Sequence, residues 1–311
     1  MSGRLLVTGA TGFVGAWVLR RWAAVHQDVE VLATSDLPST DRIPIARYRS
    51  ADLRTPDAAR DLIRWARPDT VLHLAGMIGG NDLAALLAVN VLGTHNLYRA
   101  LAAEGFASQT RVVQVSSAAV YGAVPVAAQP INEDQPLSPT TIYGVSKAAQ
   151  EHVALAAAAQ DGLAVIRARI FNLIGPGQPG QLVPMCFVSQ ISALGESEDR
   201  LEVGDVSPRR DFVDVRDAVE ALDRLLASGE PGSAYNIASG RDLSIRKVIE
   251  DLIEVSGKAV SIEIDPSRLR KGDVSQVCAD VRRIAGEVGW RAAIPVKESL
   301  RAMWSDPALS R

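Results

Sequence analysis

The chain has 311 residues, of which 47% are hydrophobic and 22% charged, and its formal net charge is −3. It is too apolar for intrinsic disorder and long enough for one large α/β domain or two closely packed ones. The slightly acidic balance argues against nucleic acid or an anionic membrane as the main partner.

The numbers and spacings of cysteine and histidine argue against a disulfide-rich or metal-binding protein. Cys186 and Cys278 are too few for a disulfide framework and form no CxxC pair, which predicts a reducing, cytoplasmic environment. The four histidines show no spacing typical of a metal site, so we expect no metal. We also expect no leader peptide, because the first residues run directly into a strand pattern, and no membrane span, because no apolar stretch is long enough.

Strand and helix patterns alternate from the first residues. Short apolar runs predict strands at 4–8, 29–33, 70–75, 111–116 and 164–169. Helical spacing between them predicts helices at 12–25, 56–66, 82–103 and 143–159. This alternation predicts βαβ units, and right-handed crossovers then give an α/β fold with a Rossmann-like, doubly wound parallel sheet.

The pattern changes after Asn172. The run GPGQPG at 175–180 is dense in turn-forming residues. Beyond it the predicted elements are shorter, with helices at 217–226, 245–255 and 281–287 and a strand at 260–264. We predict a dinucleotide-binding domain at 1–171, to which 209–233 returns. A smaller C-terminal substrate-binding domain, formed by 172–208 and 234–311, would supply the second wall of a cleft.

A glycine-rich turn joins the first predicted strand to the first helix. Gly9 permits the tight turn, Gly12 lets backbone N–H groups approach a pyrophosphate, and Gly15 lets the helix pack closely on the sheet. The strand before and the helix after are the context of a dinucleotide-binding turn, whose helix N-terminus faces negative charge. We expect cofactor contacts from Gly9, Thr11, Gly12, Phe13, Val14 and Gly15.

The choice between NAD and NADP stays open. Asp36 follows Gly15 at about the spacing at which an acidic residue binds the ribose 2′-OH of NAD. Thr34 and Ser35 precede it, however, and small hydroxyl residues there could accommodate a 2′-phosphate instead. Asp52 and Leu53 are placed to meet the adenine.

Ser117, Tyr143 and Lys147 form a candidate catalytic group. Tyr143 and Lys147 stand four residues apart, so they share one face of a helix, while Ser117 follows a strand. An ammonium beside a phenol favours the phenolate, so we expect Lys147 to lower the pKa of Tyr143. Tyr143 would then act as a general acid or base near neutral pH while hydride moves at carbon. Ser117 can hydrogen-bond the same reacting oxygen.

Motifs spread over almost the whole chain carry a family resemblance. They are TGATGFVG at 8–15, HLAG at 73–76, NVLGT at 90–94, VSSAAVYG at 115–122, YGVSK at 143–147, RARIFNLIGPGQ at 167–178, RRDFVDVRD at 209–217, YNIASG at 235–240 and RKGD at 270–273. With them the chain resembles the extended short-chain dehydrogenase/reductases of the nucleotide-sugar epimerase/dehydratase group. The resemblance implies a nucleotide-diphosphate sugar as substrate and NADP or NAD as cofactor.

The resemblance also implies roles for single residues. Ser117, Tyr143 and Lys147 would be the catalytic triad, with Lys147 also at the nicotinamide ribose. Ser117 and Asn172 would contact the sugar-nucleotide, and Arg210 and Arg270 its diphosphate, which suits guanidinium donors. The remaining cofactor contacts would come from Leu74, Ala75, Gly76 and Asn90.

Two positions discriminate among the activities of the group. In the resembling dehydratases a carboxylate stands where this chain has Ala119, and alanine cannot transfer a proton. Similar epimerase-reductases use a cysteine there and a histidine after the NxxGP loop, where this chain has Gly177 and Gln178. With dehydration and epimerisation at C3 and C5 disfavoured, hydride transfer at C4 of the sugar is the activity that remains. The finer resemblance, strongest over 209–304, is to GDP-4-keto-6-deoxy-D-mannose reductases. A 4-epimerase with tightly bound NAD and a non-catalytic NADP-sensing protein are the alternatives.

The two long helices also suggest an assembly. The segments 82–103 and 143–159 carry Ala and Leu on more than one face, and a helix that is apolar all round must be covered on both sides. In the resembling family these helices pair across a two-fold axis, so we expect a homodimer through a four-helix bundle. Coverage by the second domain of the same chain is the alternative.

Overall fold

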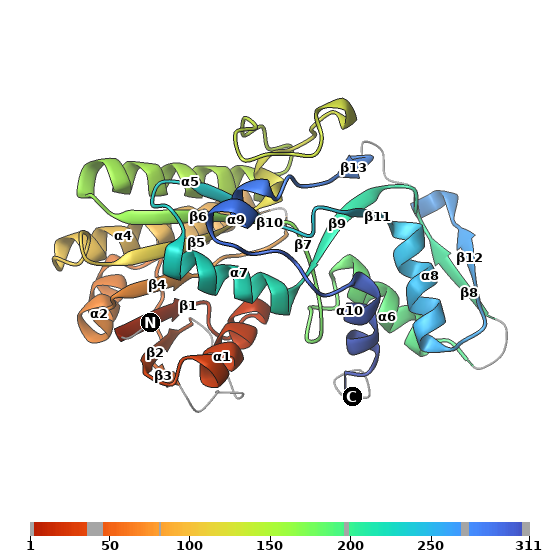
Figure 1. Ribbon diagram of the computed structural model, residues 1–311, viewed down its shortest axis with the longest axis horizontal. Helices are drawn as coiled ribbons and strands as arrows, with labels where there is room; N and C mark the ends of the chain where they lie inside the picture. Colours follow the sequence, from red (N-terminus) through yellow and green to blue (C-terminus); the bar gives the residue numbers. More distant parts are fainter. Residues whose placement is uncertain (1–2, 36–45, 81, 196–198, 269–273, 307–311) are drawn as a thin grey trace.

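The structure is a computed structural model that describes residues 3–35, 46–80, 82–195, 199–268 and 274–306. A large part is built on a parallel sheet, and a smaller part that carries α6, α8 and α10 lies beside it (Figure 1). In the part of the chain described, no helix is both long and apolar enough to cross a membrane.

The large part contains a seven-stranded parallel sheet with the strand order β10-β6-β5-β4-β1-β2-β3. Its strands are β1 (Gly3–Thr8), β2 (Val29–Thr34), β3 (Ala46–Tyr48), β4 (Thr70–His73), β5 (Arg111–Ser117), β6 (Ala164–Ile170) and β10 (Ala234–Ile237). The strand order reverses direction between β1 and β4, which is where dinucleotide-binding sheets leave a crevice for their ligand. The expected Rossmann-like parallel sheet is confirmed.

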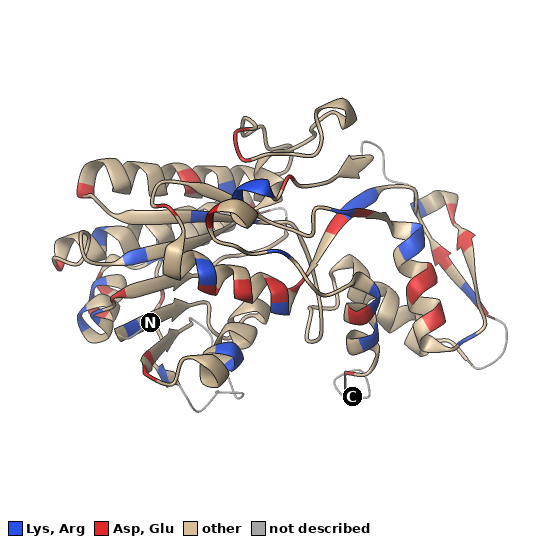
Figure 2. Cartoon of the chain, in the orientation of Figure 1, with Lys and Arg blue, Asp and Glu red and all other residues tan. Residues whose placement is uncertain are grey.

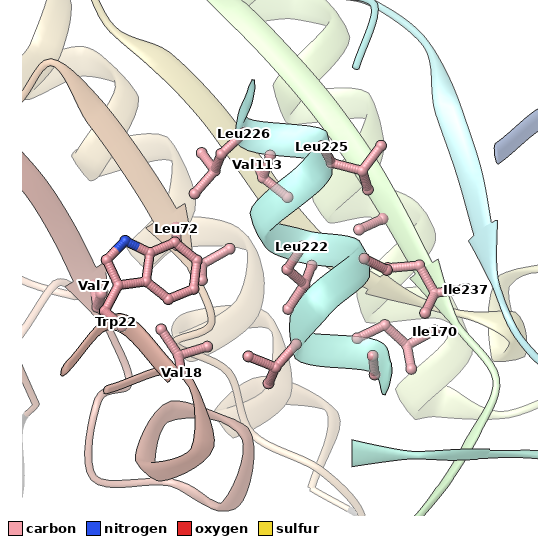
Figure 3. Packing of buried hydrophobic residues seen from close by; sticks show 14 of the residues in the cluster. Val7, Val18, Trp22, Leu72, Val113, Ile170, Leu222, Leu225, Leu226 and Ile237 are labelled. Atoms are coloured by element: carbon pink, nitrogen blue, oxygen red, sulfur yellow. The ribbon is translucent and has the colours of Figure 1, made fainter. Parts of the chain in front are cut away.

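Helices cover both faces of this sheet, which is why its strands read as nearly continuous apolar runs. One face carries α1 (Phe13–Val25) and α7 (Val215–Ser228), and the other carries α2 (Pro56–Ala66), α4 (Gly93–Ala103) and α5 (Ile142–Asp161). On the first face Leu222 and Leu225 of α7 lie over the strands, with Trp22 of α1 beside them (Figure 3).

The predicted long helix at 82–103 is a composite. Asp82 caps its start by accepting the Ala85 N–H at 3.0 Å. The helix continues through α3 (Leu83–Leu86), a π-helical turn (Leu87–Leu92) and α4. Such π turns often lie at functional sites, and this one contains Asn90.

The smaller part has two small sheets and its own hydrophobic core. A four-stranded sheet contains β7 (Asn172–Ile174), β9 (Arg209–Asp214), β11 (Asp242–Ser244) and β13 (Gln276–Val277). A parallel pair joins β8 (Asp199–Val203) to β12 (Val260–Ile264). Its helices are α6 (Val183–Ala193), α8 (Ile245–Ser256) and α10 (Val296–Trp304). The short helix α9 (Arg282–Glu287) lies against β10, and Ile284 packs in the main core, so α9 belongs to the large part although it was predicted for the substrate domain.

Strand pairing differs from the predicted domain boundaries at two places. β10 pairs with β6 in the main sheet, although residue 234 was predicted to begin the second part of the substrate domain. β9, inside the segment 209–233 predicted to return to the first domain, belongs to the small sheet instead, whereas α7 does pack on the main sheet. The chain therefore passes between the two parts at places that the local spacing of hydrophobic residues does not predict. The predicted strand at 70–75 ends earlier, at His73.

We expect Trp22 to be a principal packing residue of this core. It has no exposed surface, and its indole N–H has no hydrogen-bond partner among the described residues. Trp22→Ala should lower the free energy of unfolding by about 3–5 kcal/mol, because it leaves a cavity. Trp22→Phe should cost clearly less, since it keeps an aromatic ring and removes the unpaired donor. Urea unfolding followed by circular dichroism measures both; equal losses would contradict this packing role.

Candidate active site

A cavity of about 900 Å³ is lined by residues from both parts of the chain. Its size lies in the range of small-molecule sites. The large part contributes the segment after β4, the end of β5, the start of α5 and Val14 of α1. The smaller part contributes residues of α6 and of the segment after β8, together with Arg210 and Arg268.

Ser117, Tyr143 and Lys147 all line this cavity, so the structure brings the predicted group together. Tyr143 lies in the first turn of α5, whose start is fixed by Thr141, which accepts the Gly144 N–H at 3.0 Å. Lys147 Nζ donates to the carbonyl oxygen of Val115 at 2.7 Å, which fixes the lysine at the end of β5.

Burial dominates the electrostatics of this group. It raises the pKa of Tyr143 above the ordinary value, and a hydrogen bond with Ser117 only partly opposes that rise. Burial also lowers the pKa of Lys147 to about 8, against the opposing charge of Glu151. The expectation that Lys147 would lower the pKa of Tyr143 is therefore wrong for this geometry, because removal from water penalises phenolate and ammonium alike. Tyr143 is a protonated phenol near neutral pH, as a proton donor must be.

The glycine-rich turn has the close backbone approach that the sequence predicted. Gly9 has a φ of +67°, and a Cβ there would lie 2.7 Å from the Ala75 nitrogen. A Cβ on Gly15 would lie 2.5 Å from the Gly9 carbonyl oxygen, so only glycine lets α1 begin so close to the turn. No side chain caps the start of α1 at Gly12, which leaves its first N–H groups to an anion. These features fit a dinucleotide pyrophosphate.

The other predicted cofactor residues have varied surroundings. Leu74 and Gly76 line the cavity with Val14. The backbone N–H of Ala75 donates to the Thr8 hydroxyl at 3.1 Å, which fixes the chain after β4. Thr11, by contrast, exchanges a hydrogen bond of 2.8 Å with the hydroxyl of Ser35, at the end of β2.

Asp52 and Leu53 are already engaged within the protein. Asp52 forms an ion pair of 2.8 Å with Arg54, which holds the pKa of the carboxyl below its usual value. The Leu53 side chain packs into the core under α2 and α4, and its carbonyl accepts from Asn96 at 2.9 Å. Asp36 lies outside the described residues.

Asn90 supports the site from behind rather than lining the cavity. Its side chain accepts the Met77 N–H at 2.7 Å and donates to the Met77 carbonyl at 3.1 Å and the Ser146 hydroxyl at 2.9 Å. It thus ties the loop after β4 to α5 beside Lys147. The direct cofactor contact that the sequence predicts for Asn90 stays a prediction, and the partners of its amide within the chain are what the motif alone did not indicate.

Besides Ser117, two predicted substrate residues, Asn172 and Arg210, line the same cavity. Asn172 Nδ2 donates to the Asp211 carbonyl at 3.0 Å, and Arg210 Nη1 donates to the Val274 carbonyl at 2.7 Å. Arg270 lies outside the described residues. The sequence analysis did not identify Arg268, which also lines the cavity and is held by Glu202 and Asp265. Arg268 belongs to no motif of its own and stands just before the RKGD motif, so nothing in the sequence distinguished it as a site residue.

No group of three or more His, Cys, Asp or Glu side chains among the residues described could hold a metal ion. The two cysteines are free, Cys186 on the surface and Cys278 partly buried.

Known proteins resemble the chain over nearly its full length. The family model described as GDP-mannose 4,6 dehydratase matches residues 6–303. The GDP-6-deoxy-D-mannose reductase of Pseudomonas aeruginosa is 39% identical over 98% of this chain and 97% of that protein. The structure of RMD from Pseudomonas aeruginosa complexed with NADPH superposes with a TM-score of 0.85 at 38% identity, covering 98% of both chains. The UDP-glucose 4-epimerase of Thermus thermophilus in complex with NAD gives a TM-score of 0.84 at 28% identity, covering 97% of both chains.

We expect Gly15→Ala to weaken cofactor binding at least about 10-fold, because the added methyl group forces α1 away from the turn. Gly286→Ala is the matched control, since a Cβ there meets nothing within 4 Å. Quenching of protein fluorescence by NADPH measures the affinity of each variant. Unchanged affinity in a folded Gly15→Ala protein would contradict the assigned role of the turn.

Proposed function

The chain belongs to the GDP-mannose 4,6 dehydratase family, and from this membership we propose that it reduces the 4-keto group of a nucleotide-linked 4-keto-6-deoxyhexose with NADPH or NADH. The observation that carries the proposal is the convergence of Ser117, Tyr143 and Lys147 on one cavity that also contains Arg210. The identity to a GDP-6-deoxy-D-mannose reductase supports GDP-4-keto-6-deoxy-D-mannose as the substrate.

When bound, a reduced nicotinamide cofactor would be the source of the hydride that adds to C4. Tyr143 then gives its phenolic proton to the oxygen at C4, and Ser117 hydrogen-bonds the same oxygen. Lys147, four residues after Tyr143 on α5, would provide positive charge in the same cavity and a donor for the nicotinamide ribose. Arg210 and Asn172 hold the nucleotide-sugar across the cavity, with the guanidinium at the diphosphate.

Ala119 supports reduction over dehydration. It lies in a 3₁₀ turn at Ala118–Val120 directly after β5. A 4,6-dehydratase needs an additional acid/base group here, and a methyl side chain cannot transfer a proton. In our proposal the chain therefore does not share the 4,6-dehydratase activity for which its family is named.

NADPH is the cofactor that we favour. The strand β2 ends at Thr34, and the hydroxyl of the next residue, Ser35, meets that of Thr11. The Thr34 hydroxyl is buried without a hydrogen-bond partner among the described residues. Small hydroxyl groups at this strand end suit a ribose 2′-phosphate, and the Pseudomonas relative was solved with NADPH.

The partners follow from the same site and surface. Acidic and basic residues are mixed along α7, and along α8 the basic residues come first and the acidic ones follow (Figure 2). Neither helix carries basic residues alone, which supports a small-molecule substrate rather than a nucleic acid or an anionic membrane. The two free cysteines support a cytoplasmic location.

The deciding experiment is NADPH and NADH oxidation with GDP-4-keto-6-deoxy-D-mannose that a separate dehydratase forms in the assay. Stoichiometric oxidation of either cofactor is expected, and the ratio of the two rates gives the cofactor preference. If the protein binds cofactor but oxidises none, the reductase proposal fails. Interconversion of a nucleotide-hexose without net oxidation would then identify a 4-epimerase, and absence of all turnover a cofactor-sensing protein.

Tyr143→Phe should reduce kcat by about 10²-fold or more, because it removes only the proton donor. Cofactor affinity should stay close to that of the wild-type protein, since the ring is retained. Steady-state rates and NADPH titrations measure the two quantities. Wild-type turnover in this variant would rule out the assigned proton transfer.

We also propose a homodimer through the helices α3 to α5. Apolar residues lie exposed on this surface, namely Leu83, Leu92, Val145 and Leu155. Leu92→Glu combined with Leu155→Glu should give a monomer, whereas Val25→Glu, an exposed position on α1, should leave the assembly unchanged. Sedimentation velocity measures the mass; a wild-type protein that sediments as a monomer over a wide concentration range would contradict the dimer.

A further inference from the structure

Glu151 is a fully buried carboxylate behind the catalytic group. It lies on α5 one turn after Lys147 and two turns after Tyr143, so the three residues follow one face of the helix. A buried carboxylate is costly unless charges and hydrogen bonds compensate it. The proposed reaction has no step at Glu151, so its presence here needs another reason.

The partners of Glu151 come from two neighbouring strands. The Ser116 hydroxyl donates to its Oε1 at 2.6 Å. Arg169 of β6 donates to both oxygens, with Nε 3.0 Å from Oε1 and Nη2 2.8 Å from Oε2. Arg167 adds a longer contact of 3.4 Å. Charge-assisted, bidentate contacts of this kind fix a carboxylate in one orientation.

These contacts set the register between β5 and α5. Three consecutive residues at the end of β5 each meet a different residue of the helix. The Val115 carbonyl accepts from Lys147 at 2.7 Å, and Ser116 donates to Glu151 at 2.6 Å. Ser117, the next residue of the strand, lines the same cavity as Tyr143, and its hydroxyl lowers the pKa of that phenol. Glu151 holds the middle residue, so its loss would release Ser117 relative to Tyr143.

Glu151 is also the carboxylate that supports the charge of Lys147. Burial lowers the pKa of Lys147 to about 8, and Glu151 opposes that shift. Tyr143 on the same helix is a neutral phenol, and burial lowers the pKa of His73 on β4 to about 3, so His73 is neutral as well. On β6, Arg167 and Arg169 face Glu151 and are cations.

We propose that Glu151 is a positioning residue of this active site, which fixes Ser117 opposite Tyr143 through Ser116 and keeps Lys147 as an ammonium. The inference rests on the proposed function for its catalytic meaning. The effect of Glu151 on the charge of Lys147 concerns only residues of this chain, and it can be tested without measuring turnover.

The test compares Glu151→Gln with Asp161→Asn. Asp161 ends the same helix about 15 Å further along, from a rise of about 1.5 Å per residue, and pairs with Arg99 at the surface. Both variants remove one carboxylate. The readout is the dissociation constant of NADPH against pH, measured by fluorescence, because the Lys147 ammonium would bind the nicotinamide ribose.

The expected direction of the change in the NADPH-binding midpoint follows from the pKa of Lys147. Lys147 has a lowered pKa in the folded protein, and loss of the opposing carboxylate lowers it further, so the ammonium is lost at lower pH. In Glu151→Gln the alkaline midpoint of NADPH binding should fall by about one pH unit. In Asp161→Asn it should stay at the wild-type value. A midpoint in Glu151→Gln that coincides with wild type would overturn the electrostatic role.

Two further variants complete the test. Ser116→Ala keeps the charge and should leave the midpoint unchanged while kcat falls about 10-fold at constant KM for NADPH, since only the alignment is lost. An unchanged kcat would overturn the alignment role. If Glu151→Gln does not fold, because Arg169 loses its counter-charge, the double variant with Arg169→Met removes both buried charges. Its midpoint should also fall below the wild-type value, but by less, because loss of the Arg169 cation offsets part of the effect. A wild-type protein that binds NADPH but turns over no substrate would refute the proposed function and still allow the binding measurement.

Discussion

The packing of α5 against the carboxyl end of β5 is the constraint on which the candidate site depends. Lys147 reaches the Val115 carbonyl across this contact, and Glu151 reaches Ser116. Because a strand and a helix are both stiff, two such contacts fix the relative position of everything between them. Tyr143 and Ser117 therefore converge without a dedicated loop, at a place where the parallel sheet opens toward ligand.

Burial gives this contact its chemical character. The side chains of Tyr143, Lys147 and His73 are largely removed from water. Burial raises the pKa of Tyr143 and lowers those of Lys147 and His73. His73 can stay neutral because the hydroxyls of Thr8 and Thr94 meet its two ring nitrogens at 2.7 and 2.8 Å. The site thus begins with a protonated tyrosine, which suits delivery of a proton to a reduced carbonyl better than removal of one.

The smaller part completes the site through contacts that tie it to the cofactor side. The Trp17 indole of α1 donates to the Pro176 carbonyl at 3.0 Å, so the turn after β7 is held against the helix that begins at the glycine-rich turn. Asp211 in β9 accepts from Ser239, Gly240 and Ala279, which joins three segments distant in the sequence. Arg210, the preceding residue, lines the cavity at that junction.

The sequence by itself determined the central strands of the main sheet, the helices that cover it and the identity of the main chemical groups. Gly9 and Gly15 at a strand-to-helix turn, and Tyr143 four residues before Lys147, are local patterns whose geometry follows from one turn or one helix. Only the tertiary structure decided the rest. The raised pKa of Tyr143, the supporting role of Asn90 and the contacts of Glu151 depend on burial and on partners in other elements. The same holds for β10, which enters the main sheet beside β6 although it follows β9 of the smaller part, because pairing between distant strands is set by the whole fold and not by local spacing.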